Sequence, residues 1–308
     1  MTVVRVAVVG FGKIARDQHL PALAQSDEFE LVAAVDPRET APDGIAHFET
    51  LEALLSSECA FDAVSLCTPP QIRHDIAQAA IAAGKHVLLE KPPAANLSEV
   101  AALDVAAQRA GVSLLAAWHS RYAAGVVPAR SWLAIRDIRS VAINWCEDVR
   151  QWHPGQPWIW AAGGFGVFDP GINALSIATA ILPRPLAVEG GVLQYPANCE
   201  APVSGQIALR EAGGAPVSLT LDFLQTGPQI WDIEVETDAG TLLLHHGGRD
   251  LVTPDGSIPG MDAEYAGIYR HFAETIRGGS IELDAEPLRL VTDALMRCRS
   301  ERVAEFHE

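Results

Sequence analysis

The chain has 308 residues, of which 49% are hydrophobic and 20% are charged, and it carries a net charge of −17. This composition is typical of a well-packed soluble protein with one large domain or two ordinary ones. The acidic balance argues against binding to nucleic acid or to anionic membranes, because no basic field would attract their phosphates. No apolar run is long enough to span a bilayer, and the five scattered cysteines have no metal spacing, so we expect free thiols in a reducing cytoplasm.

The first predicted element is a valine-rich strand over residues 2–9, which runs into the turn Gly10-Phe11-Gly12-Lys13-Ile14-Ala15. Gly10 allows a tight turn, and Gly12 lets the backbone approach a pyrophosphate. A helix over residues 13–24 would direct the amides of Lys13 and Ile14 at the phosphates, and the Lys13 ammonium could neutralise one of them. The pattern predicts a dinucleotide site, although an isolated match of this kind also fits a simple tight turn.

The second predicted strand, residues 31–35, ends in Asp36. Asp36 follows the glycine turn at close to the roughly 20-residue spacing of an acid that binds the adenosine ribose hydroxyls. An acid there would repel a 2′-phosphate, so we expect NAD to be preferred; the alternative is an acid that merely ends a strand. Arg38 could pair with a 2′-phosphate or stack on adenine, which predicts some use of NADP.

Strands and helices continue to alternate up to residue 117, which implies a parallel doubly wound sheet. The further predicted elements of this part are a helix at 51–56, a strand at 63–67, a helix at 74–83, a strand at 86–89, a helix at 98–110 and a strand at 113–117. Thr68 and Pro69 follow the third strand, where the backbone commonly faces the nicotinamide ribose. His74 opens the next helix, where it contacts the cofactor or only caps the helix.

After His119 the hydrophobic pattern changes to period two, which suggests a large, mainly antiparallel open sheet. The predicted elements are a helix at 126–136, strands at 140–147, 204–210, 217–223, 231–237 and 240–245, and helices at 264–277 and 287–305. We therefore predict an α/β chain with a Rossmann domain over residues 1–119 and a substrate-binding α+β domain over 120–308. The segment 152–166, rich in Pro, Gly and Trp, is typical of a functional loop.

Two further motifs carry a family resemblance. Glu90-Lys91-Pro92 ends a strand of the first domain, and Gly163-Gly164-Phe165-Gly166-Val167-Phe168-Asp169-Pro170-Gly171-Ile172-Asn173 lies in the second. Together with the glycine turn they resemble the Gfo/Idh/MocA oxidoreductase family over essentially the whole chain. The branch with bacterial L-arabinose and D-galactose 1-dehydrogenases is similar in four more segments: Arg16-Asp17-Gln18-His19-Leu20-Pro21, Trp118-His119-Ser120-Arg121, Glu147-Asp148-Val149-Arg150 and Trp152-His153-Pro154-Gly155-Gln156.

The resemblance implies oxidation of a cyclic aldose at its anomeric carbon, with a lactone as the product. Lys91 and Asp169 are the expected acid–base pair, and either one could take the O1 proton. The family usually has His or Tyr where this chain has Asn173, which cannot act as a base near neutral pH. Asn173 is therefore expected to orient the sugar or a water, and Glu90 could bond a ribose hydroxyl.

The same resemblance places four side chains around the sugar: His119, Glu147, Trp152 and Trp231. Taken singly, each has an ordinary alternative, such as a hinge position for His119 or a core position for either tryptophan. The sequence does not rank L-arabinose, D-galactose and D-fucose, because they differ mainly at C5, a difference worth about 1–3 kcal/mol in a pocket.

Other functions also fit the family pattern. The chain could oxidise a polyol or another aldose, act as an NAD-dependent glycosidase, or be a non-catalytic sensor of sugar and dinucleotide. Retention of Lys91 and Asp169 argues against the sensor. No metal site is expected, and a homodimer that pairs through the open sheet is a reasonable default.

Overall fold

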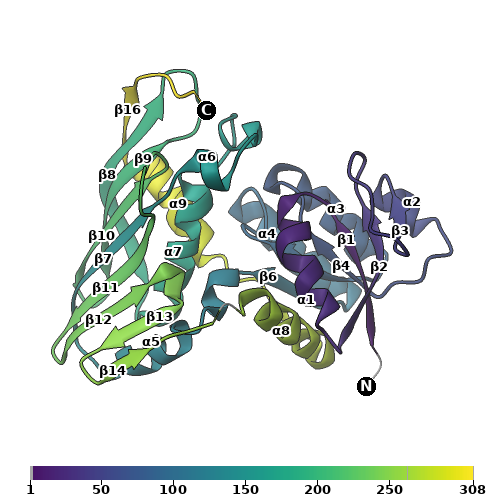
Figure 1. Cartoon of the computed structure of the whole chain (residues 1–308), viewed down its shortest axis with the longest axis horizontal. Helices are drawn as coiled ribbons and strands as arrows, with labels where there is room; N and C mark the ends of the chain where they lie inside the picture. The colour runs from purple at the N-terminus through teal and green to yellow at the C-terminus, as the bar shows by residue number, and fades with distance from the viewer. Residues whose placement is uncertain (1–2, 262, 308) are drawn as a thin grey trace. The chain divides into compact units, whose positions relative to one another are not determined.

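The structure, a computed structural model, describes residues 3–261 and 263–307 and forms two compact units (Figure 1). The first unit contains the residues through His119 together with Glu264–Ala285, and the second contains Ser120–Ala263 and the residues from Glu286 onward. The first break therefore falls between His119 and Ser120. The segment Glu264–Ala285, assigned from the sequence to the second domain, packs within the first unit.

The first unit is built on a seven-stranded sheet in the order β15-β6-β5-β4-β1-β2-β3, with all neighbours parallel. Its strands are β1 (Val4–Val9), β2 (Phe29–Val35), β3 (Ala46–Phe48), β4 (Ala63–Leu66), β5 (His86–Glu90), β6 (Leu114–Ala117) and β15 (Ile281–Glu282). Strands β4 and β6 are buried along their whole length, as expected when helices cover both faces. The predicted doubly wound sheet is confirmed; Thr2, where the first strand was predicted to start, lies outside the described residues.

The helices of the first unit follow the predicted alternation, with two differences. They are η1 (Ala15–His19), α1 (Leu20–Ala24), α2 (Leu51–Leu55), α3 (Pro70–Ala82), α4 (Leu97–Ala110) and α8 (Glu264–Gly278). The predicted helix over 13–24 contains a π-helical turn, η1, which places His19 in the interior. Helix α3 begins at Pro70 rather than at His74, because a proline in the first turn has no N–H to leave unsatisfied.

The second unit is built on a nine-stranded sheet in the order β14-β13-β12-β11-β7-β10-β9-β8-β16. Its strands are β7 (Ile138–Cys146), β8 (Leu186–Pro196), β9 (Ser204–Glu211), β10 (Pro216–Asp222), β11 (Ile230–Thr237), β12 (Gly240–His245), β13 (Asp250–Thr253), β14 (Gly256–Ile258) and β16 (Arg299–Val303). Only β7 with β10 and β8 with β16 pair in parallel among these described strands. The predicted mainly antiparallel sheet is confirmed.

Helices cover one face of this sheet, and α7 packs against α9 on it (Figure 1). The helical segments are η2 (His119–Tyr122), α5 (Val126–Leu133), α6 (Val149–Trp152), η3 (Pro157–Ile159), α7 (Phe168–Ile181), η4 (His246–Gly248) and α9 (Glu286–Arg297). Alternate residues of β9, such as Ile207 and Leu209, are buried, whereas Gln206 and Arg210 are exposed. This period-two pattern matches a sheet with one packed face and one polar face.

Several elements of the second unit differ from the sequence analysis, and strands β8, β13 and β14 were not predicted. The predicted helix over 287–305 is wrong beyond Arg297, since Arg299–Val303 forms the edge strand β16, whose backbone pairs with β8. Helix α7 was not predicted at all, because Pro170 and Gly171 in its first turns resemble loop residues. At Gly171 an added Cβ would lie 2.8 Å from the end of the Leu221 side chain on β10, so the glycine lets α7 pack closely on the sheet.

Candidate functional site

The glycine turn lies between the ends of β1 and β2. Gly10 has φ +85° and donates its N–H to Val35 O at 2.8 Å. An added Cβ would lie 2.8 Å from the Thr68 backbone nitrogen, so the turn after β1 and the loop after β4 touch through this glycine. At Gly12, an added Cβ would meet no atom within 4 Å. The backbone at Gly12 is therefore open to approach, as a pyrophosphate would need.

The helix that follows the turn begins at Lys13, and Arg16 N–H donates to Gly12 O at 3.2 Å. The Lys13 ammonium forms an exposed ion pair with Asp17 one turn later. The Ile14 side chain is half-buried, and its backbone lies in the first turn of the helix. The structure thus places Lys13 and Ile14 where the sequence predicted them, at the first turn after the glycines.

Asp36 ends β2 beside this turn and organises the backbone around it. Its Oδ2 accepts the Phe11 N–H at 2.9 Å, and its Oδ1 accepts the N–H groups of Arg38 at 2.9 Å and Glu39 at 3.0 Å. Burial acts to raise the pKa of Asp36, but these backbone bonds outweigh it, and the pKa lies below its ordinary value. The carboxylate is held ionised and keeps lone pairs that ribose hydroxyls could use. The Arg38 residue is exposed.

The loop after β4 offers an unsatisfied hydroxyl. Thr68 is 8% exposed, and its Oγ1 has no hydrogen-bond partner within the described residues. Pro69 is half-buried beside it, and the half-buried His74 ring bonds Asp75 at 3.0 Å. An orphaned buried hydroxyl carries an energetic cost, so a ligand that bonds Thr68 Oγ1 would stabilise the loop. This observation fits a bound dinucleotide.

Arg73 ties the loops after β4 and β5 together, and sequence reasoning missed it. The residue is 2% exposed, and its guanidinium donates to the backbone carbonyls of Thr68, Glu90 and Pro92. An arginine that satisfies three carbonyls fixes two loops that are distant in sequence. The only signal in the sequence is its place on the buried side of α3, which is not specific.

Glu90 is the centre of a buried hydrogen-bond cluster beneath Lys91. Its Oε1 accepts the Tyr265 hydroxyl at 2.8 Å and lies 3.0 Å from His19 Nε2, and its Oε2 accepts the Lys91 backbone N–H at 2.9 Å. Burial would raise the pKa of Glu90, but the bond and the charge of His19 lower it to about 2. Burial acts to lower the pKa of His19, yet its neighbours Cys67, Tyr269 and Glu90 raise it well above its usual value.

Both Glu90 oxygens therefore accept hydrogen bonds from groups of the first unit. Lys91 is half-buried, and its backbone N–H is held by one of these bonds. Sequence reasoning named Glu90 as a ribose ligand but did not identify His19 or Tyr265 as its partners. Tyr265 comes from α8, 175 residues further along the chain. The RDQHLP segment contains His19, but nothing in it shows that the ring is buried on a carboxylate.

His119 is also held by α8. Its Nδ1 lies 2.5 Å from Glu264 Oε2, and its ring stacks on Tyr265 with centroids 5.6 Å apart. A carboxylate on Nδ1 fixes the orientation of the ring and its tautomer. Glu264 is a further residue that the sequence analysis did not identify.

Three of the predicted sugar-binding residues meet in the second unit. Glu147 follows β7 and is 5% exposed, and its Oε2 accepts the Trp231 indole N–H at 2.8 Å. The rings of Trp152 and Trp231 pack edge to face with centroids 5.3 Å apart. Trp152 stays 40% exposed, so part of its indole remains available to a ligand. A buried carboxylate beside an indole surface suits a ligand that has both hydroxyl groups and C–H faces.

Asp169 lies in the first turn of α7 and is 4% exposed. His153 connects it to Glu147: its Nδ1 is 3.5 Å from Asp169 Oδ2 and its Nε2 is 3.3 Å from Glu147 Oε1. Asn173 follows one turn after Asp169, so the two side chains share a face of α7. The predicted residues thus form two sets: cofactor candidates, Lys91 and His119 in the first unit, and the remaining candidates in the second.

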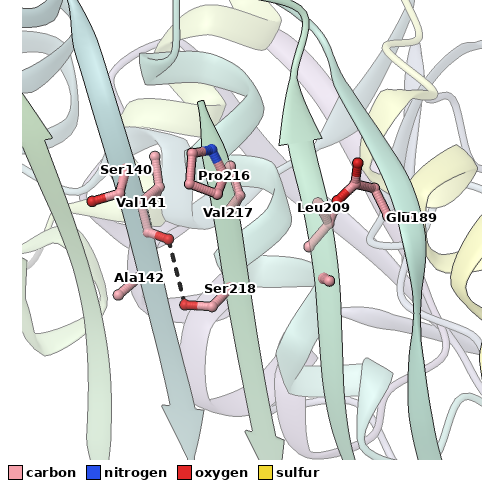
Figure 2. Close-up of a pocket in the computed structure, with 9 residues that line it drawn as sticks. Ser140, Val141, Ala142, Glu189, Leu209, Pro216, Val217 and Ser218 are labelled. Atoms are coloured by element: carbon pink, nitrogen blue, oxygen red, sulfur yellow. Dashed lines mark hydrogen bonds between the residues drawn. The ribbon is translucent and has the colours of Figure 1, made fainter. Parts of the chain in front are cut away.

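Other surfaces of the second unit lie apart from these residues. A shallow depression on the exposed sheet face lies across β7 to β10, where Ser218 Oγ donates to Val141 O at 3.5 Å (Figure 2). None of the predicted site residues lines it. In residues 3–261 and 263–307, no cluster of three or more His, Cys, Asp or Glu side chains could hold a metal ion. Across the same residues, no helix has the length and apolar character needed to cross a membrane.

Comparison with known proteins gives matches along the whole chain. The Gfo/Idh/MocA sequence model, described as an oxidoreductase family with an NAD-binding Rossmann fold, matches residues 4–117. The chain is 42% identical over 310 aligned positions to a galactose 1-dehydrogenase of Pseudomonas fluorescens, with 100% of both chains covered. The crystal structure of a D-galactose-1-dehydrogenase protein from Rhizobium etli superposes with a TM-score of 0.95 at 51% identity, covering 100% of this chain and 99% of that one.

A more distant structure shares the fold alone. It is a 3-ketoreductase of Actinomadura kijaniata solved with NADP and TDP-benzene, with a TM-score of 0.84, 22% identity and coverage of 98% and 100%. The full-length relative at 42% identity confirms the resemblance read from the glycine turn, Glu90-Lys91-Pro92 and the segment that ends in Asn173. The chain belongs to the Gfo/Idh/MocA family of oxidoreductases.

Proposed function

We propose that the protein oxidises the anomeric carbon of D-galactose and L-arabinose, and also of D-fucose, to the corresponding lactones, with NAD preferred over NADP. The full-length similarity to two galactose 1-dehydrogenases carries the proposal. The buried carboxylates and indoles of the second unit support a sugar as the ligand. The five free thiols fit the reducing cytoplasm in which we propose the protein works.

The dinucleotide would be held by the first unit. The open backbone at Gly12 and the amides of Lys13 and Ile14 would receive the pyrophosphate, and Gly10 keeps that turn close to Thr68. Asp36 would accept the adenosine ribose hydroxyls, and its negative charge opposes a 2′-phosphate. Arg38 lies two residues further on and would attract a 2′-phosphate. We therefore expect NADP to be used as well, but less well than NAD.

The nicotinamide side of the cofactor would meet the loops after β4 and β5. Thr68 Oγ1 is a buried hydroxyl with no hydrogen-bond partner among the described residues. Pro69 follows Thr68 in the chain, His74 lies in the next helix, and Glu90 ends β5. Bound nicotinamide supplies the hydride acceptor of the reaction. Thr68 and Pro69 would face the nicotinamide ribose, and Glu90 would bond a ribose hydroxyl. His74 would contact the cofactor, and Arg73 keeps both loops in place.

The sugar O1 proton must be removed as C1 is oxidised, and we assign this work to Lys91 and Asp169. Lys91 is held by the buried Glu90 cluster, and Asp169 is held at the start of α7. Asn173, on the same helix face as Asp169, would orient the sugar or a water. The amide can donate and accept hydrogen bonds, but it does not carry the proton.

Four side chains would bind the sugar. Glu147 would accept hydrogen bonds from sugar hydroxyls, and Trp231 holds Glu147 in place. The exposed part of the Trp152 indole would pack on C–H groups, and the His119 ring, oriented by Glu264, would contact the sugar. For the assembly we propose a homodimer that pairs through the exposed face of the nine-stranded sheet. Light scattering coupled to gel filtration measures the molar mass in solution, and the mass of a monomer would contradict the proposed dimer.

The test is nicotinamide reduction followed at the absorbance of the reduced ring, over a panel of aldoses and polyols with NAD and NADP in parallel. Rapid reduction with D-galactose or L-arabinose, with a lactone identified by NMR, is the expected result. Reduction with polyols alone would assign a different substrate of the same family. Absence of reduction, with dinucleotide binding confirmed by calorimetry, would refute the proposal.

A further inference from the structure

His153 lies between two buried carboxylates in the second unit. The side chains of Glu147 and Asp169 are 7% and 6% exposed, and that of His153 is 18% exposed. The ring packs against Phe223 with centroids 5.5 Å apart, and the His153 N–H donates to Val149 O at 2.8 Å. The backbone of α6 and an aromatic neighbour therefore fix the ring in this position.

Both ring nitrogens face carboxylate oxygens, which limits how protons are distributed. A neutral imidazole has one N–H and one lone pair, and a lone pair directed at a carboxylate oxygen is repulsive. The contacts are satisfied when the ring is an imidazolium between two carboxylates. They are equally satisfied when one carboxyl is protonated and donates to a neutral ring. These states contain the same number of protons and differ only in which atom holds them.

The distances of 3.3 Å and 3.5 Å are longer than a good N–H···O bond of about 2.7–3.2 Å. Hydrogen bonds of catalytic groups are often long without substrate and shorten in the complex. The Trp231 indole N–H holds Glu147 Oε2, so that Oε1 is the oxygen directed at the ring. The ionisable groups that the structure places against the ring are Glu147 and Asp169, from the end of β7 and from α7.

We propose that His153 relays the proton released during sugar oxidation, acting through Asp169; this inference rests on the proposed function. Before the reaction the ring is neutral, with its proton on Nε2 toward Glu147 and its lone pair on Nδ1 toward Asp169. When the O1 proton has reached Asp169 Oδ2, it removes the repulsion between this lone pair and the carboxylate. The ring then accepts that proton at Nδ1 and releases the other from Nε2 to Glu147 or to water. Asp169 is then a carboxylate again, and no proton is gained or lost in the transfer. The imidazole can accept a proton at one nitrogen and release one from the other, which the amide of Asn173, on the adjacent turn of α7, does not.

The relay is tested with His153→Gln and His153→Ala, measured as kcat with D-galactose and NAD between about pH 6 and pH 9. Glutamine retains hydrogen-bonding atoms near both carboxylates but does not carry a proton. We expect both variants to lower kcat by roughly 10–100-fold with an unchanged KM for NAD. Added imidazole should restore turnover in His153→Ala, because the site is partly open to solvent, and should have no effect in His153→Gln, where the space is filled.

His246→Gln is the matched control, since it removes an imidazole from an exposed carboxylate pair with Asp250 elsewhere in the same unit. It should keep wild-type kcat. Wild-type kcat in His153→Gln across the pH range would refute the relay, because a purely structural side chain is replaced there by a hydrogen-bonding one. A His153→Ala variant with native circular dichroism that no imidazole restores would refute it too. A wild-type protein inactive on every aldose would instead refute the proposed function, and the relay with it.

Discussion

Substitution of the two turn glycines by alanine should separate folding from cofactor binding, because Gly10 and Gly12 have opposite surroundings. At Gly10, φ is +85°, and an added Cβ would lie 2.8 Å from the Thr68 nitrogen and 2.9 Å from the Cys67 carbonyl carbon. At Gly12, the same added atom would meet nothing within 4 Å. The first alanine therefore collides with the folded chain, and the second collides only with a ligand.

The magnitude for Gly10→Ala follows from two costs. The left-handed conformation costs an alanine about 1–2 kcal/mol, and forced separation of packed groups costs about 1–3 kcal/mol more. The colliding atoms are backbone, so no rotamer change relieves the contact. We expect a loss of about 2–5 kcal/mol in unfolding free energy, which lowers the Tm of the first unit by roughly 5–15 °C.

Scanning calorimetry without ligand measures the Tm, and isothermal titration with NAD measures binding. Gly12→Ala should unfold within about 1 °C of the wild type, because its Cβ enters open space, yet bind NAD at least about tenfold more weakly, since the pyrophosphate needs that space. A Gly10→Ala protein as stable as the wild type would refute the argument from close contact. Normal NAD affinity in Gly12→Ala would show that the pyrophosphate does not approach this backbone.

Three further predictions concern charged groups of the first unit. Asp36→Asn should move the ratio of kcat/KM for NAD and NADP toward NADP by about tenfold, because a neutral amide no longer repels a 2′-phosphate; a wild-type preference for NADP in steady-state assays would contradict this. Lys91→Met should lower kcat by about 10²–10⁴-fold and leave the NAD Kd within about threefold, and near-normal turnover in the same assay would exclude its role in proton transfer. Glu90→Gln should lower the unfolding free energy by about 3–5 kcal/mol at neutral pH, since it leaves the buried His19 imidazolium without its carboxylate. The pKa of Glu90 falls from 4.5 to about 2 on folding. Its contribution to the unfolding free energy is therefore complete above about pH 4.5 and is lost toward pH 2. Urea unfolding should show a smaller difference in unfolding free energy between variant and wild type near pH ~3.5 than near pH ~7.

Local sequence patterns predicted the elements whose residues are buried in a regular way. The strand at Gly240–His245 was predicted with its observed bounds, and the buried strands of the first unit were recognised from their runs of small apolar residues. The error at β16 has a physical cause. Residues 299–303 are mostly exposed and charged, which fits a helix as well as a strand, and only pairing with β8 decides between them.

The sequence predicts those residues of the candidate site that lie in motifs shared with the family. It does not predict residues whose role depends on contacts with distant parts of the chain. Tyr265 matters through a bond to Glu90, 175 residues away, and Arg73 matters through carbonyls of two separate loops. His153 lies in a segment noticed for its resemblance, but only the fold of that segment brings its ring between Glu147 and Asp169. Such roles depend on long-range contacts, which no local pattern encodes.

The assignment of Glu264–Ala285 to the first unit has a consequence for how the protein is made. This segment supplies β15 beside β6, as well as Tyr265 and Tyr269 around the buried His19. During translation all of Ser120–Ala263 is synthesised before it, a delay on the order of 10 s at roughly 5–20 residues per second. Until then the nascent nucleotide-binding unit has an uncovered sheet edge and a polar cluster without its tyrosines.

The two units therefore cannot be separated by a single cut in the gene. A fragment that stops at His119 would lack both β15 and α8, whereas a fragment with residues 264–285 joined after residue 119 through a short linker would contain every strand of the parallel sheet. In this chain, the domain that begins first in the sequence is completed only after most of the other domain has been synthesised.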